Sequence, residues 1–218
     1  PKWMASMIHV VLVDDASQKY PARGVLKKYS KLPVKIDLYR IKKNIAWNIP
    51  VARNLAMDKA DDGWILSTDI DLIFPLLSIL RLLRKDLNEK WIYRPIRQGE
   101  CKSIWGAYGK RYHRETLIVT KKMFWEIGGF DEDLTGFWNG AFYPFNKHLK
   151  KDFTVQVLDD VRLYDYSEKI RDASTVTWSR SGGEFDIQQN KKMLSLQKNK
   201  AQMYAPSVLT QEWEKEQI

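Results

Sequence analysis

The apolar run Ile8–Val13 (I-H-V-V-L-V), which stops at the acidic pair Asp14 and Asp15, constrains the fold of this chain more than any other segment. A short run rich in β-branched residues is typical of a strand buried on both faces, as in a parallel sheet covered by helices. In such sheets, ligands bind beyond the carboxyl ends of the strands. We therefore expect a covered sheet with a binding site beside Asp14 and Asp15.

The rest of the chain alternates between strand and helix patterns. Val34–Tyr39 predicts a second strand, and Trp64–Thr68 predicts a third that runs into Asp69, Ile70 and Asp71. Between them, Pro50 suits the first turn of a helix, where its missing N–H costs nothing. Further strands are expected at 91–93, 116–120, 155–158 and 161–164, and further helices at 75–87, 121–127 and 186–203. This alternation predicts an α/β domain with a mostly parallel, Rossmann-like sheet flanked by helices.

Composition narrows the class of protein. A chain of 218 residues suits one domain, and no apolar run approaches the roughly 20 residues of a membrane helix. The single cysteine, Cys101, excludes an internal disulfide framework, and no secretory signal is visible, so we expect a reducing, cytoplasmic location. The net charge of +9 favours an anionic partner such as a nucleotide, a nucleic acid or a phospholipid surface.

Asp69 and Asp71 form the most informative pair of carboxylates. At a strand's end, two aspartates at this spacing can converge on one hard cation such as Mg²⁺ or Mn²⁺. A cation held there neutralises a leaving diphosphate. A pair of this kind is also typical of two solvated aspartates at a strand-to-turn boundary, so the pair alone does not decide the function.

Four segments in order strengthen the case. They are V-L-V-D-D-A-S (11–17), V-A-R-N-L-A (51–56), W-I-L-S-T-D-I-D (64–71) and I-G-G-F-D-E-D-L (127–134). Together they resemble family 2 glycosyltransferases of the glycosyltransferase A fold, over roughly residues 8–140. The resemblance implies one glycosyltransferase domain over 1–218, with a nucleotide-sugar half at 8–75 and an acceptor half at 90–180. A helical tail at 186–218 would complete it.

The resemblance also implies roles for single residues. Asp15 would accept a hydrogen bond from the base of the nucleotide. The residue types themselves offer a structural alternative that is compatible with this role: Asp14 and Asp15 form the turn, and Asp14 caps a helix. Arg53 would lie near the nucleotide and the metal, although a surface ion pair is an alternative for this residue. Asp69 would lie towards the ribose or a metal-bound water, and Asp71 would be the direct metal ligand.

Three departures from the family pattern stand out. The family's domain normally opens with one more strand and a helix before V-D-D-A-S, whereas only Pro1–Met7 precede it here. The stretch Gly136–Pro144, where the family usually carries the catalytic base, contains no carboxylate, which makes Asp133 the candidate base. The histidine that often completes the metal shell late in these domains is not evident.

The acceptor side is expected from Trp91–Arg114 and Phe137–Phe145. Its aromatic residues suit sugar faces or stacked bases, and its interleaved Arg and Lys suit phosphate. The aromatic candidates are Trp105, Tyr108, Trp138 and Tyr143, each of which could instead pack in the core. A glycan, a lipid-linked sugar and modified viral DNA remain open as acceptors, the last requiring a flipped or unpaired base.

The expected function is therefore a metal-dependent glycosyltransferase of the hexosyl- or pentosyltransferase class. It would use Mn²⁺ or Mg²⁺ to move a sugar from a nucleotide diphosphate donor, expected to be a UDP-sugar, to an acceptor hydroxyl with inversion. Two alternatives stay open. One is a degenerate domain that binds carbohydrate or nucleic acid, and the other is a sugar-nucleotide nucleotidyltransferase, whose glycine-rich phosphate loop is not visible here. Peripheral contact with an anionic surface and a viral or bacterial origin are compatible with the sequence.

Overall fold

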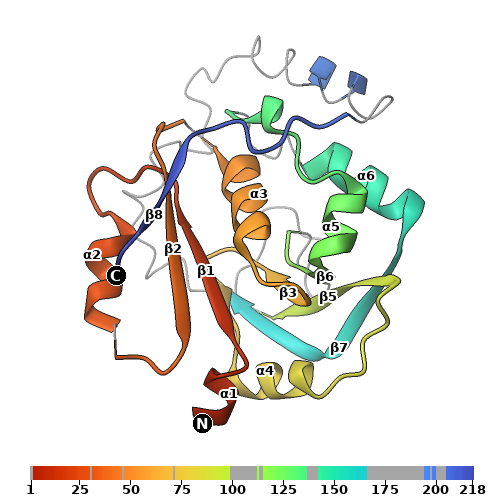
Figure 1. The fold of residues 1–218 in the computed structure, drawn as a ribbon. Helices are drawn as coiled ribbons and strands as arrows, with labels where there is room; N and C mark the ends of the chain where they lie inside the picture. The colour runs from red at the N-terminus through yellow and green to blue at the C-terminus, as the bar shows by residue number, and fades with distance from the viewer. Residues whose placement is uncertain are drawn as a thin grey trace.

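A computed structural model of the chain describes residues 2–29, 31–45, 47–70, 72–98, 112, 115–136, 142–165, 194–196, 198–199 and 205–218. Strands and helices alternate within these residues and confirm the α/β class (Figure 1). None of the helices within these ranges is long and apolar enough to span a membrane. The elements in chain order are α1 (Lys2–Ala5), β1 (His9–Asp14), α2 (Ala22–Leu26), η1 (Lys27–Tyr29), β2 (Lys35–Ile41), α3 (Ile49–Lys59), β3 (Trp64–Ser67), β4 (Leu72–Ile73), α4 (Leu76–Leu83), β5 (Trp91–Gln98), β6 (Leu117–Thr120), α5 (Lys121–Ile127), η2 (Glu132–Leu134), α6 (Phe142–Asp152), β7 (Thr154–Asp165) and β8 (Trp213–Glu216).

The described strands form two sheets, with orders β1-β2-β8 and β3-β6-β5-β7-β4. The β1–β2 and β5–β7 pairings are parallel, and the other four pairings are antiparallel. The sheets are therefore mixed, which corrects the expectation of a mostly parallel sheet. The physical reason is that β6 follows β5 and runs back beside it, a pairing that needs no helical crossover. Among the described strands β1 pairs only with β2 and β3 only with β6, so no strand pairing joins the two sheets.

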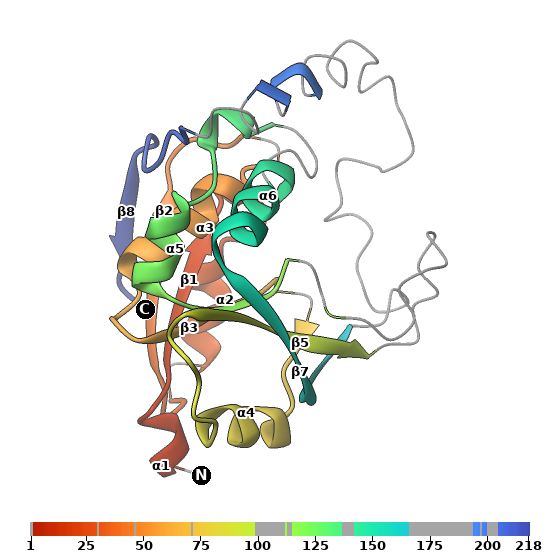
Figure 2. The same ribbon diagram turned by 90° about the vertical axis from the view of Figure 1, so that its right-hand side faces the viewer.

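The five-stranded sheet is covered on both faces, because successive residues of a strand point to opposite sides. Ile92 of β5 and Leu117 of β6 pack in the cluster that contains α5 and α6 residues. Their neighbours Tyr93 and Ile118 pack in a second cluster with Leu82 of α4. Figure 2 shows α4 on one side of the sheet and α5 and α6 on the other.

Helix α3 lies between the two sheets (Figure 1). Val51 and Leu55 pack with Tyr39 of β2, whereas Met57 belongs to the cluster of β5, β6 and α5. Pro50 occupies the first turn, as predicted. Because this helix contacts both halves of the molecule, its polar side chains can connect them.

The C-terminal segment departs from the predicted helical tail. Residues 194–196 and 198–199 are helical, but 205–210 form a non-helical connection and β8 pairs antiparallel with β2. Trp213 of β8 packs edge-on against Tyr39 at 5.7 Å between ring centroids, and the Nζ atom of Lys59 lies 4.0 Å from the Trp213 ring. These tertiary contacts favour a strand where the charged local sequence E-W-E-K-E carries little strand signal.

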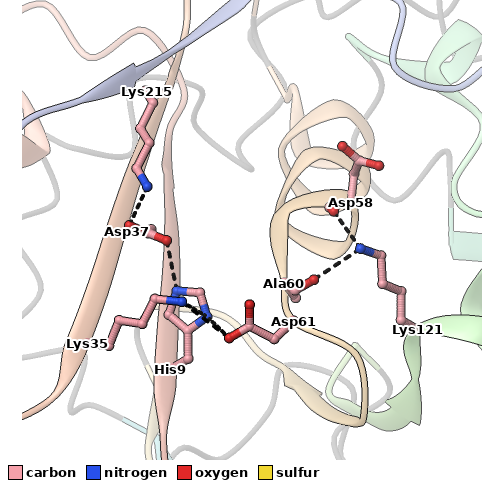
Figure 3. Close-up of polar contacts among 8 residues, drawn as sticks. All are labelled: His9, Lys35, Asp37, Asp58, Ala60, Asp61, Lys121 and Lys215. Carbon is pink, nitrogen blue, oxygen red and sulfur yellow. Dashed lines mark hydrogen bonds and ion pairs between the residues drawn. The ribbon is translucent and has the colours of Figure 1, made fainter.

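A polar network ties β1, β2 and β8 to the connection before β3 (Figure 3). His9 of β1 bonds Asp37 through Nε2 at 3.0 Å and Asp61 through Nδ1 at 2.7 Å. Lys215 of β8 lies 2.7 Å from the other carboxylate oxygen of Asp37. The hydrogen bond from Lys215 is the largest effect on the pKa of Asp37 and, with a smaller contribution from the His9 hydrogen bond, holds it below its ordinary value although burial opposes this. His9 is therefore a strand residue with both ring nitrogens hydrogen-bonded.

Gly129 is a position that no other residue should fill without strain. Its φ of +73° lies in the left-handed region, and an added Cβ would lie 2.8 Å from Cζ3 of Trp125 and 3.1 Å from Oδ1 of Asn54. We expect Gly129→Ala to lower the free energy of unfolding by about 1–3 kcal/mol in denaturant titration. Gly24 of α2 is the matched control, because nothing lies within 4 Å of its added Cβ. Gly24→Ala should raise stability by about 0.4–1 kcal/mol, and equal effects at both positions would contradict the prediction.

Candidate functional site

Arg53 and Asp69 form a pair at the carboxyl end of β3. The guanidinium of Arg53 donates to Oδ1 of Asp69, and its Nη1 donates to Ser67 Oγ at 3.0 Å and to the backbone oxygen of Glu115 at 2.7 Å. Arg53 is only 8% exposed. A cation this deeply buried needs several acceptors, so the geometry answers the question that the sequence left open: Arg53 is not in a surface ion pair.

Aromatic rings line the other side of the Arg53 guanidinium. Its Cζ atom lies 5.2 Å from the Phe142 ring centroid and 5.9 Å from that of Phe130. Both distances lie within the range of cation–π attraction. Phe130 stacks in turn on Phe145 at 4.2 Å, so the rings that hold Arg53 belong to the packed core. The core therefore fixes the direction in which the guanidinium points.

The chain turns immediately after Asp69. Strand β3 ends at Ser67, and the N–H of Leu72 donates to the Asp69 carbonyl at 3.4 Å. Ile70 is 96% exposed at this turn. Asp71 lies outside the described residues, so its predicted role as metal ligand stays a prediction.

The ligand chemistry at this turn fits a hard divalent cation. The side chain of Asp69 is 28% exposed, which leaves its carboxylate accessible from solvent. Within the described ranges no group of three or more His, Cys, Asp or Glu residues gathers that could hold a metal ion. A cation at Asp69 would therefore need further oxygen atoms from Asp71 and from phosphate groups of a substrate. That sharing is typical of Mg²⁺ and Mn²⁺, and it needs no histidine.

Asp14 and Asp15 have different roles at the end of β1. The Asp14 carboxylate accepts from the N–H groups of Ser17 and Ala22, both at 2.7 Å, so it shapes the turn and caps α2 as predicted. Asp15 accepts from the side-chain amide of Asn48 at 2.8 Å. Burial raises the pKa of Asp15 to about 6, opposed by the Asn48 hydrogen bond and assisted by the charge of Asp14. The pKa of Asp15 therefore lies well above the ordinary value of an aspartate.

Asn54, next to Arg53 on α3, holds the I-G-G-F-D-E-D-L segment. Its side chain accepts from the N–H of Phe130 at 2.8 Å and donates to the Phe130 carbonyl at 2.7 Å and to Glu132 Oε1 at 2.8 Å. Glu132 is buried, and its carboxylate also accepts from Leu209 and Thr210. Glu132 thus anchors two chain segments.

Asp133 and Tyr143 are the remaining described candidates. Asp133 lies on η2, is exposed, and accepts from Ser207 Oγ at 3.2 Å. Tyr143 on α6 is 58% exposed, so it is available to a ligand and does not pack in the core. Trp105, Tyr108 and Trp138 lie outside the described residues. The roles of all five candidates remain predictions.

A hollow of about 430 Å³ lies elsewhere, beside α2 and β8. It is lined by Pro21, Arg23, Gly24, Lys27, Arg40 and Glu216. Neither Arg53 nor Asp69 borders it, so it is separate from the pair at the end of β3. Arg40 in its wall donates to the Ser17 carbonyl at 2.9 Å, which gives that cation a structural role.

Sequence reasoning missed three residues that support the candidate site. Asn48 precedes the first turn of α3, but its side chain makes no cap to that helix and donates to Asp15 instead. Asn54 lies inside the V-A-R-N-L-A segment, so its place in that motif was an available signal. Gln211 and Asn48 each donate a side-chain hydrogen bond to the other at 3.2 Å. The charged sequence around Gln211 contains no motif that predicts this contact.

The sequence model of the family described as "Glycosyl transferase family 2" matches residues 5–147. Comparison with curated protein sequences gave no match. The matched range contains all four segments that suggested the resemblance.

Solved structures show the same fold at low sequence identity. A mannosyltransferase from Pyrobaculum calidifontis, in complex with GDP-mannose and Mn²⁺, has a TM-score of 0.54 and 14% identity over 91% of this chain and 56% of its own. GalNAc-T7 with UDP, GalNAc and Mn²⁺ has a TM-score of 0.53 and 15% identity over 75% and 38%. Drosophila β1,4-galactosyltransferase 7 with xylobiose has a TM-score of 0.52 and 13% identity over 86% and 80%. The chain thus spans 56% of the mannosyltransferase and 38% of GalNAc-T7, and the predicted glycosyltransferase A fold is confirmed.

Proposed function

The chain belongs to glycosyl transferase family 2, and from this premise we propose that it transfers a sugar from a nucleotide diphosphate donor to an acceptor hydroxyl. The donor is a UDP-sugar, and the reaction inverts the configuration of the transferred sugar. The observation that carries the proposal is the buried Arg53 paired with Asp69 at the carboxyl end of β3. A fixed guanidinium beside an accessible carboxylate suits a site that receives both phosphate and a cation.

The residues at the ends of β1 and β3 then have separate roles on the donor side. Asp15 accepts a hydrogen bond from the base, and Asp69, oriented by Arg53, joins Asp71 in holding Mn²⁺ or Mg²⁺. When bound, the cation neutralises charge on the leaving diphosphate. Arg53 keeps the Asp69 carboxylate in one orientation, because the guanidinium is itself fixed by Ser67 and the Glu115 carbonyl.

The acceptor side is proposed from exposure and composition. Asp133 removes the proton from the attacking hydroxyl, with its carboxylate oriented by Ser207. Tyr143, with Trp105, Tyr108 and Trp138, contacts the acceptor. Aromatic and basic residues in this part of the chain favour a glycan or lipid-linked sugar that carries negative charge.

Calorimetry of the whole chain with UDP, in Mn²⁺ and after chelation by EDTA, tests the proposal. We expect UDP binding that requires the metal, together with slow hydrolysis of a UDP-sugar detected by mass spectrometry. UDP binding unaffected by EDTA would contradict the metal site. Salt-sensitive DNA binding without any nucleotide binding would favour a binding domain in place of an enzyme.

Use of the donor should depend on pH through Asp15. Because the pKa of Asp15 is raised to about 6, the carboxylate is mostly ionised above that pH and mostly protonated below it. A protonated carboxyl group accepts a hydrogen bond less well, so kcat/KM for a UDP-sugar should fall below a midpoint near pH 6. The diphosphate diester of the donor does not titrate there. Asp15→Asn should lower kcat/KM and remove this midpoint, whereas an unchanged midpoint would assign the titration to another group.

A further inference from the structure

A chain of side-chain hydrogen bonds links the C-terminal segment to Asp15. Asn48, which is fully buried, donates to Asp15 Oδ1 at 2.8 Å through the same amide nitrogen that donates to Gln211 Oε1 at 3.2 Å. Gln211 returns a hydrogen bond from its Nε2 to Asn48 Oδ1 at 3.2 Å. The amide of Asn48 is therefore held on both its oxygen and its nitrogen, and its direction towards Asp15 depends on Gln211.

Unusual backbone conformations gather at the same three points. Among the described residues, those other than glycine with positive φ are Ala16 at 54°, Trp47 at 53° and Leu209 at 55°. Ala16 adjoins Asp15, Trp47 adjoins Asn48, and Leu209 lies two residues before Gln211. A side chain makes the left-handed conformation costly, and such residues persist where the surrounding structure holds them, often at binding sites.

The C-terminal segment 205–216 is fixed on both sides of Gln211. Before it, the N–H of Leu209 and the N–H and hydroxyl of Thr210 donate to the Glu132 carboxylate at 2.6–2.7 Å. After it, β8 pairs with β2, and Lys42 N–H donates to the Glu212 carbonyl at 3.0 Å. The segment crosses the top of the molecule above α3 (Figure 1), so it holds Gln211 beside Asn48.

We propose that Gln211 is a positioning residue for donor recognition, which acts through Asn48 on Asp15 and is the side chain by which the C-terminal segment 205–216 supports the donor site. The proposal rests on the proposed function, because it concerns how Asp15 meets the base. Uracil presents a ring N–H that a carboxylate can accept, whereas cytosine presents a lone pair at the same ring position. Correct placement of Asp15 should therefore favour UDP over CDP.

Gln211→Ala in the whole chain tests the proposal, with Gln211→Met as a variant of similar size in case the alanine variant does not fold. We expect the KM for the UDP-sugar to rise about tenfold, the effect of losing one orienting hydrogen bond at a charged group, with kcat within about twofold. Preference for UDP over CDP in binding should fall by a similar factor. Equal weakening of UDP and CDP would show a merely structural role and overturn the proposal.

Glu212→Ala is the matched control, because Glu212 is the next residue and its side chain is 83% exposed. That side chain pairs with the exposed Lys42 and not with Asn48. The variant should leave KM and nucleotide preference unchanged, and a Glu212 effect as large as that of Gln211 would overturn the proposal.

Carboxyl NMR of the free protein separates the positioning role of Gln211 from the proposed function, because it needs no donor. Asn48→Ala and Gln211→Ala should both raise the titration midpoint of Asp15, since both weaken the hydrogen bond that lowers its pKa. A raised midpoint without UDP binding would reject the function and keep the positioning role, whereas UDP binding with an unmoved midpoint in Gln211→Ala would reject the positioning role.

Discussion

Replacing Asp69 with alanine should weaken Mn²⁺-dependent UDP binding by at least about 100-fold, because two effects act together. The substitution removes a carboxylate from the proposed cation site, where losing even a group that only supports a metal ligand typically costs about 10–100-fold in metal affinity. It also leaves the buried Arg53 without its carboxylate partner. Calorimetry with UDP and Mn²⁺ would measure the loss.

The stability of the Asp69→Ala protein should fall as well, by about 1–3 kcal/mol. The cost stays below that of breaking a fully buried pair because Arg53 keeps Ser67 and the Glu115 carbonyl as acceptors, and because Asp69 is partly exposed. Asp69→Asn separates folding from function, since an amide oxygen can still accept from Arg53 but carries no charge for the cation. We expect that variant to fold with nearly normal stability and to bind UDP no better than Asp69→Ala.

Asp62→Ala is the control for this series, because Asp62 is an exposed aspartate at the opposite end of β3. It should leave UDP affinity unchanged. Near-normal metal-dependent UDP affinity in a folded Asp69→Asn protein would reject the assignment of Asp69 to the donor site. Asp71→Ala should reproduce the loss of binding without the loss of stability if Asp71 is a direct metal ligand.

Glu132→Ala should produce the largest loss of stability, about 3–5 kcal/mol in denaturant titration, because the carboxylate accepts four hydrogen bonds and one to a charged group is typically worth about 1.5–3 kcal/mol. Glu132 is 5% exposed, and its carboxylate accepts hydrogen bonds from Asn54, Leu209 and Thr210. Its removal leaves donors on two separate segments without their acceptor, the buried Asn54 on α3 and the pair Leu209 and Thr210 on the C-terminal segment. The C-terminal segment 205–216 should then open, so its amide hydrogens should exchange much faster than those of α5.

Glu126→Ala is the matched control for Glu132→Ala. Glu126 lies on α5, its side chain is 49% exposed, and it faces Lys122 at 3.8 Å in a pair four residues apart. Such pairs contribute about 0.3–0.5 kcal/mol, so this control should be nearly neutral. A loss below about 1 kcal/mol for Glu132→Ala, or uniform exchange across the molecule, would show that Glu132 does not anchor the segment.

Local pattern was enough to predict the elements whose signals are short-range. The strand before Asp14, the proline in the first turn of α3, and the helix that ends at Gly128 all follow from burial periodicity and backbone preference. Pairing direction could not be predicted in the same way, because it depends on where a connection returns. Strand β8 was missed because its charged residues become a strand only against β2.

The sequence by itself determined the α/β class, the acidic ends of β1 and β3, and the family, because these depend on residue types at fixed short spacings. Only the tertiary structure decided which partners those residues take. Arg53 bonds Asp69 across 16 positions, and Asn48 bonds Gln211 across 163. Contacts between residues so distant along the chain arise from packing α3 between two sheets, and no local pattern in the amino-acid sequence encodes them.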